Sequence, residues 1–124
     1  MEDLERVGGA CRDDPVLDAG VIQSLRALSE RDEQGLFGQL AEIFDASAVD
    51  RLASLRRARR DEDVAGLARA AHALRGSAAA LGATRLCQLC AHIERNGASE
   101  GVLDHVAVEL GRVRAALGSL AASG

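Results

Sequence analysis

Two segments of this chain repeat apolar residues at alternating spacings of three and four, and this pattern constrains the fold more than any other feature. The first segment carries Val64, Leu67, Ala71, Leu74, Ala78 and Leu81, and the second carries Leu103, Val106, Leu110, Val113, Leu117 and Leu120. Such spacing places an apolar stripe along one side of an α-helix, and a second helix must cover that stripe. The pattern therefore predicts a fold in which helices pack on helices.

The composition also favours helices over sheets. Of the 124 residues, 48% are hydrophobic, yet only Phe37 and Phe44 are aromatic, so alanine and leucine must fill the core. Sheets prefer β-branched and aromatic residues, whereas alanine and leucine are strong helix formers. A chain of this length usually forms a single domain.

Three further helices are expected from the periodicity and from the residues at helix ends. A short first helix begins at residue 17, and a second helix of about 25 residues, which spans about 37 Å, follows it. The first of the two periodic segments is the third helix, and a fourth helix follows that segment. The long helix carries its apolar face on Leu36, Phe37, Leu40, Ile43, Phe44, Ala48, Leu52 and Leu55, and the fourth on Leu86, Leu89, Cys90 and Ile93. Short connections join neighbouring helices antiparallel.

Capping residues mark where these helices begin and end. The acidic residues 61–63 suit the start of the third helix, Thr84 and Ser99 are expected N-caps, and Asn96-Gly97 is a typical helix end. We predict an all-α fold, an antiparallel up-and-down four-helix bundle with a short additional N-terminal helix. Residues 17–122 form this bundle, and residues 1–16 are expected to be a linker or flexible extension.

The charge balance argues against a nucleic-acid binder. Nineteen acidic residues against fifteen basic ones give a net charge of −4, whereas such proteins need an excess of positive charge. The arginines at positions 56, 57, 59 and 60 suit the C-terminus of a helix, where they complement its dipole. Neither a membrane span nor a signal peptide is visible, so we expect a cytoplasmic protein without membrane contact.

The three cysteines are best explained as reduced thiols. Their number is odd, and a disulfide framework would be denser and normally even. Cys87 and Cys90 stand three residues apart with His92 nearby, but a zinc site usually needs a second ligand pair. Cys90 falls on the apolar stripe and is predicted to be a core residue, while His92 and His105 are expected at the surface. We predict no metal or cofactor of the chain's own.

His72 is the candidate for chemistry. It lies one position off the apolar seam of the third helix, so its ring should reach solvent. Gly76 lies one turn later, and a glycine inside a helix destabilises that helix by about 1 kcal/mol relative to alanine. No cap or turn explains why a glycine stands at this position. A neutral imidazole is a nucleophile near pH 7, and Arg75 could hold phosphate oxygens. Taken alone, however, a surface histidine beside arginines is usually only a solvated side chain.

The surrounding residues resemble a known family. The run 70–78, which reads AAHALRGSA, together with Leu81-Gly82-Ala83 and Leu86, is similar to the signature of the histidine-containing phosphotransfer domain of bacterial multistep phosphorelays. That signature has an alanine-histidine pair followed by leucine, a basic residue, glycine, serine and a later leucine-glycine-alanine. The similarity extends over residues 17–122, and the family's fold is a four-helix bundle.

The resemblance implies roles for individual residues. His72, through Nε2, would accept a phosphoryl group from the aspartyl phosphate of a receiver domain and pass it to another receiver's aspartate. Arg75, which stands where the family usually has lysine, would contact the phosphoryl oxygens, Gly76 would give access and Ser77 would support the site. Glu94 matches the position that orients the histidine by a hydrogen bond to its other ring nitrogen.

The resemblance also implies partners. Receiver domains of response regulators, including those of a hybrid sensor kinase, would dock on a surface made by Ala68, Arg69, Arg75, Gly76 and Ala79. The receiver would supply Mg²⁺, since the chain has no glycine-rich phosphate loop and no lysine. The alternative is a docking or dimerisation module with the same fold, which would be expected to lack the histidine. The hypothesis that the chain is an acyl carrier has less support, because the Asp-Ser-Leu signature of acyl carriers is absent.

Overall fold

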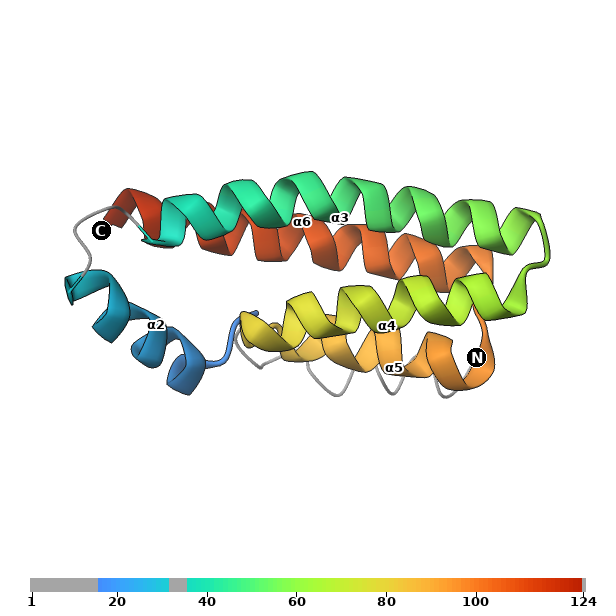
Figure 1. Ribbon diagram of the computed structural model, residues 1–124, viewed down its shortest axis with the longest axis horizontal. Helices are drawn as coiled ribbons and strands as arrows, with labels where there is room; N and C mark the ends of the chain where they lie inside the picture. The colour runs from blue at the N-terminus through green and yellow to red at the C-terminus, as the bar shows by residue number, and fades with distance from the viewer. Residues whose placement is uncertain (1–15, 32–35, 124) are drawn as a thin grey trace.

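The computed structural model describes residues 16–31 and 36–123, and these residues contain five α-helices and no β-strand (Figure 1). The helices are α2 (Ala19–Arg31), α3 (Leu36–Arg60), α4 (Val64–Ala80), α5 (Thr84–Asn96) and α6 (Glu100–Ser123). The predicted all-α fold is confirmed. Residues 1–15, where the expected linker falls, lie outside the described part of the chain.

Helices α3 to α6 form the predicted antiparallel four-helix bundle. Figure 1 shows α3 paired with α6 along its length, α4 paired with α5, and α2 set apart at one end. The neighbours around the bundle are α3 with α4, α4 with α5, α5 with α6 and α6 with α3. The outer face formed by α4 and α5 is therefore on the opposite side of the bundle from the face formed by α3 and α6.

Aliphatic side chains fill the core, as the composition predicts. Among the side chains that the structure describes, Phe44 is the only buried aromatic residue, and the largest fully buried side chains are mostly leucines. They are Leu55, Leu74, Leu86, Leu103 and Leu117, together with Ile93, Val106, Val113 and Cys90. The buried alanines Ala71 and Ala78 let α4 approach its neighbours closely. Cys90 is confirmed as a core residue.

Among the described side chains of the predicted apolar faces, Val64 and Ile43 are exposed, so the prediction of burial was wrong at these two positions. Val64 is 80% exposed because it is the first residue of α4, at the edge of the bundle. Ile43 is 66% exposed and lies at the rim of a groove of about 170 Å³ between α3 and α4. Ser77 and Ala80 line the α4 side of this groove. Their small side chains leave Ile43 uncovered.

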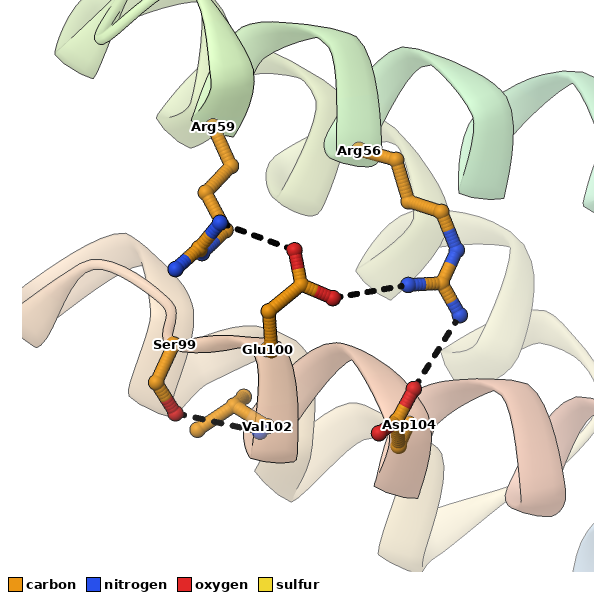
Figure 2. Close-up of polar contacts among 6 residues, drawn as sticks. All are labelled: Arg56, Arg59, Ser99, Glu100, Val102 and Asp104. Atoms are coloured by element: carbon orange, nitrogen blue, oxygen red, sulfur yellow. Dashed lines mark hydrogen bonds and ion pairs between the residues drawn. The ribbon is translucent and has the colours of Figure 1, made fainter.

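The helix ends follow the expected capping chemistry with one exception. The Asp63 carboxylate accepts the backbone N–H of Gly66 at 2.9 Å. Figure 2 shows the second cap, in which the Ser99 hydroxyl accepts the backbone N–H of Val102 at 3.3 Å. Gly97 has φ +77°, as its position after Asn96 predicts. Thr84 is not an N-cap: Ala83 holds that position without a side-chain cap, so the prediction for Thr84 was wrong.

The observed start of α5 differs from the predicted one because of the conformation of the turn between α4 and α5. Gly82 adopts φ +71°, and its carbonyl accepts the backbone N–H of both Thr84 and Asp18. A Cβ on Gly82 would also meet Asp18 and Val21. The start of α2 therefore packs on this turn, and Val16, which the sequence assigns to the extension, packs against the core.

Ion pairs join the C-terminal turns of α3 to the start of α6. Arg59 binds Glu100 at 2.8 Å, and Arg56 bridges Glu100 and Asp104 at 3.5 and 3.4 Å (Figure 2). Part of the arginine cluster therefore has acidic partners on a neighbouring helix, which sequence spacing alone did not show. Among the described residues, no helix combines the length and apolar character needed to cross a membrane.

Candidate functional site

The candidate site is centred on His72, in the middle of α4. The core residues of α4 lie on the opposite side of the helix, and this periodicity turns His72 outward. Its side chain is 69% exposed, which confirms the predicted access to solvent. The antiparallel neighbour α5 brings Glu94 to the same level of the bundle.

Two side chains contact one nitrogen of the His72 ring. The Glu94 carboxylate has Oε1 at 3.0 Å from Nδ1, and the Arg75 guanidinium has Nη2 at 3.1 Å from the same atom. Arg75 Nε also lies 2.9 Å from Oε2 of Glu94, as an ion pair. The Glu94 side chain is only 20% exposed, so it is held between the two helices.

These contacts determine which tautomer the ring adopts. An ionised carboxylate can only accept hydrogen bonds, so the short contact with Glu94 requires a proton on Nδ1. A protonated Nδ1 cannot also accept from Arg75, whose guanidinium is held in place by its ion pair with Glu94. We infer that Nδ1 donates to Glu94. The lone pair of the neutral ring is then on Nε2, the nitrogen that has no partner among the described residues.

Small residues surround His72 on α4. Gly76 is exposed, and a Cβ built on it would meet nothing within 4 Å. Ala79 is exposed and Ala68 is half-buried, while Arg69 extends from the exposed side of the helix. The structure thus brings together all the residues of the predicted docking surface. It also shows that packing within the chain does not require glycine at position 76.

A comparison with protein families gives one match over this region. The family model described as Hpt domain matches residues 39–123, which is more than half of the chain and includes α4 and α5. The chain belongs to the Hpt domain family. Hpt domains carry out histidine phosphotransfer in phosphorelays and interact with receiver domains of response regulators. Comparisons with curated proteins and with solved structures found no match.

Two residues of the Hpt domain support α4 from within. The Ser77 hydroxyl donates to the carbonyl of Ala73 at 3.5 Å, so Ser77 bonds within its own helix. The Cys87 thiol donates to the carbonyl of Arg75 at 3.7 Å and so connects α5 to α4 beside the site. Burial raises the pKa of Cys87, and the nearby Arg75 partly opposes that effect. Cys87 is therefore better suited to hold α4 than to act as a nucleophile.

The other histidines of the Hpt domain lie outside the site. His105 is exposed on α6, as predicted. His92 is half-buried on α5, and its Nδ1 lies 3.3 Å from Nδ2 of Asn96, one turn further along the same helix. Neither residue forms a hydrogen bond or an ion pair with His72 or Glu94. Of the three histidines in the chain, His72 is therefore the one at the centre of the candidate site.

Sequence reasoning found the members of the site but not all of their contacts. It placed Glu94 beside a ring nitrogen of His72, and the structure has them 3.0 Å apart. It expected Arg75 to face the phosphoryl group, whereas the structure pairs Arg75 with Glu94. It also missed Cys87 as a link to α4. Both contacts cross between helices, and no local spacing in the sequence encodes them.

Proposed function

We propose that His72 accepts a phosphoryl group at Nε2 from the aspartyl phosphate of a receiver domain and passes it to an aspartate of a second receiver. The contact between Nδ1 and Glu94 carries this proposal, because it leaves the exposed Nε2 with its lone pair. A receiver domain of a hybrid sensor kinase is one candidate donor.

In the first transfer, the Nε2 lone pair attacks phosphorus on the side opposite the acyl oxygen. The P–N bond forms, the bond between phosphorus and the acyl oxygen of the aspartyl carboxyl group breaks, and the receiver's carboxylate leaves with the bonding electrons. The Nδ1 proton stays in place, so the phosphorylated ring carries a positive charge. Glu94 accepts the Nδ1–H bond and stabilises that charge. The reverse sequence delivers the group to the second receiver.

The roles of the neighbouring residues follow from their positions. Gly76 leaves the approach to the ring open, and Ser77 supports the helix beneath it. Arg75 holds Glu94 and would reach phosphoryl oxygens only by shifting from this ion pair. Phosphoryl transfer depends on positioning and on charge stabilisation, usually with a divalent metal ion. We propose that Mg²⁺ comes with the receiver, because no group of three metal-ligating side chains occurs among residues 16–31 and 36–123.

The test uses a receiver domain carrying radiolabelled aspartyl phosphate. We expect label to appear on the wild-type chain and to be absent from a His72→Gln variant. His105→Gln, an exposed histidine on α6, is the matched control and should accept label normally. Phosphorus NMR with ¹⁵N-labelled histidine should place the P–N bond on Nε2.

Two results would contradict the proposal. Label transfer to His72→Gln at the wild-type rate would show that another residue is the acceptor. Binding of the receiver without any labelling of the wild-type chain would instead support the docking module.

A further inference from the structure

The outer side of α3 carries a second stripe of residues, separate from the stripe that faces the core. Its members are spaced alternately by four and three residues: Glu42, Ala46, Val49, Ala53, Arg56 and Arg60. Such spacing keeps them on one side of the helix, as in helices that pack against one another. The centre of the stripe is apolar, and Val49 there is 59% exposed. This centre therefore has the pattern of a packing face, although no described helix covers it.

The neighbouring helix α6 continues the apolar surface. Val108 on its outer side is 66% exposed. Two ion pairs join α3 to α6 and bracket both valines along their helices: Asp45 with Arg114 at 2.7 Å, and Arg56 with Asp104 at 3.4 Å. Val49 and Val108 therefore lie at a similar height, on the layer that Figure 1 shows on the other side of the bundle from α4 and α5. We call this surface the α3–α6 patch, and its exposed apolar side chains are Ala46, Val49, Ala53, Val108 and Ala115.

The α3–α6 patch lies on a face with the dimensions of a specific protein–protein interface. Helix α3 has 25 residues and α6 has 24. At 1.5 Å per residue and about 10 Å per helix diameter, two such helices side by side present a face of about 740 Å². A standard interface buries about 800 Å² on each partner. Exposed apolar surface of this kind marks interaction sites on soluble proteins.

The two ends of the α3 stripe carry opposite charges. Glu42 lies seven residues before Val49, and Arg60 lies seven residues after Ala53. Both charged side chains are exposed, and neither forms an ion pair with another described residue. They are separated by about 27 Å along the helix axis, so they cannot reach each other within one chain. An ion pair between Glu42 and Arg60 therefore requires two copies of the chain.

Local effects account for only part of this arrangement. The helix dipole suits Arg60 in the last turn of α3, but it acts within the first and last turns, and the first turn of α3 contains no acidic residue. Glu42 lies beyond that turn. Asp61, Glu62 and Asp63 follow Arg60 and lower the net charge at that end. None of the three forms an ion pair with Arg60, and the Asp63 carboxylate caps α4.

We propose that the α3–α6 patch is a homodimer interface, on which a second copy of this chain packs with the two α3 helices antiparallel. A two-fold axis midway between Val49 and Ala53 places Val49 opposite Ala53 of the other copy. The same axis places Glu42 opposite Arg60 of the other copy, because the two residues are equally far from the midpoint. The pattern is thus complementary to itself, as a two-fold interface requires. His72 lies on the opposite face of the bundle and stays exposed in both copies.

Sedimentation velocity of the full chain tests the interface directly. We expect the chain to associate from monomer to dimer as its concentration rises from about 1 μM to 1 mM. Val49→Glu places an unpaired charge at the centre of the interface, so its dimer Kd should be at least about tenfold higher. Val64→Glu is the matched control, because it makes the same change at a valine that is 80% exposed at the start of α4. Its Kd should equal that of the wild-type chain.

A charge swap tests the antiparallel arrangement. Glu42→Arg and Arg60→Glu each place like charges opposite each other, and each alone should raise the dimer Kd about fivefold at low salt. The double variant Glu42→Arg/Arg60→Glu should restore the wild-type Kd. The first single change raises the net charge of the chain and the second lowers it. A general effect of net charge would therefore move the two single variants in opposite directions.

Three outcomes would overturn the proposal. The first is a wild-type chain that stays monomeric up to about 1 mM. The second is a dimer with equal Kd values for Val49→Glu and Val64→Glu, because the α3–α6 patch would then lie outside the interface. The third is a double charge variant that associates no better than the single variants, which would exclude the antiparallel pairing. None of these measurements uses a phosphorylated receiver, so the dimer and the proposed function can be rejected independently.

Discussion

At the scale of single residues, the proposed phosphotransfer depends on which ring nitrogen of His72 carries the proton. Glu94 reaches that ring from a neighbouring helix and contacts Nδ1 at 3.0 Å, while Arg75 holds the second carboxylate oxygen. At metal sites, side chains that hydrogen-bond to a ligating histidine usually change affinity or activity by about 10- to 100-fold when removed. The three residues are best regarded as one unit, in which Arg75 acts through Glu94.

Gly76 provides a sharp test at this scale, because stability and function should change in opposite directions. A Cβ at this position meets nothing within 4 Å, so Gly76→Ala should stabilise the fold by about 0.5–1 kcal/mol. The added methyl group obstructs a close approach to His72, and we expect transfer to slow about tenfold or more. Urea unfolding and the labelling assay measure the two effects.

Gly111 on α6 is the matched control for Gly76. It is also exposed in a helix, and a Cβ there also meets nothing within 4 Å, but α6 belongs to the α3–α6 face, on the opposite side of the bundle from the α4–α5 face on which His72 lies. Gly111→Ala should therefore give a similar gain in stability with normal transfer. If Gly76→Ala and Gly111→Ala transfer equally fast, Gly76 does not provide access.

At the scale of helices, the start of α4 shows how a cap and a glycine depend on each other. The Asp63 carboxylate caps the helix by accepting the Gly66 backbone N–H. A Cβ on Gly66 would collide with that same carboxylate. Gly66 is therefore needed for the cap, although helix propensity alone would favour alanine there.

We expect a double-mutant cycle to show this dependence. Asp63→Ala should cost about 1 kcal/mol through loss of the cap, and Gly66→Ala should also destabilise because the new methyl group displaces the Asp63 carboxylate. In the Asp63→Ala background, Gly66→Ala should instead be neutral or stabilising, by up to about 1 kcal/mol. Denaturant unfolding of the four proteins measures the coupling. Additive effects would contradict this account.

At the scale of the whole molecule, the absence of lysine and tyrosine simplifies how stability responds to alkaline pH. Among the described side chains, the cysteines are the groups expected to titrate between neutral pH and the arginine range. Burial raises the pKa of Cys90 from 9.0 to about 12, and the charges of Cys87 and Glu94 add to this effect. The folded state therefore holds the thiol proton more tightly than the unfolded chain does.

The sign of the pH dependence follows from that difference. Below about pH 9 both states keep the proton, and the stabilisation is fully present. Between about pH 9 and pH 12 the unfolded state loses it first, so the free energy of unfolding should fall by up to about 1.4 kcal/mol per pH unit. Cys90→Ala should flatten this slope in urea unfolding series. An unchanged slope would show that Cys90 does not control it.

The sequence by itself determined the fold class, the order of the helices and the outward position of His72. These properties follow from apolar periodicity and from local capping residues, which act within a few turns of one helix. The phosphotransfer signature around His72 pointed to the family, and Gly76 was recognisable as a residue without a local structural reason.

Only the tertiary structure decided what happens between helices. It paired Arg75 with Glu94, placed the Cys87 thiol against the α4 backbone and joined Arg56 and Arg59 to the start of α6. It also left Ile43 and Val64 exposed, although both fit the apolar pattern. Such contacts depend on the rotation and relative height of neighbouring helices, which the packing of the whole core sets and no short stretch of sequence encodes.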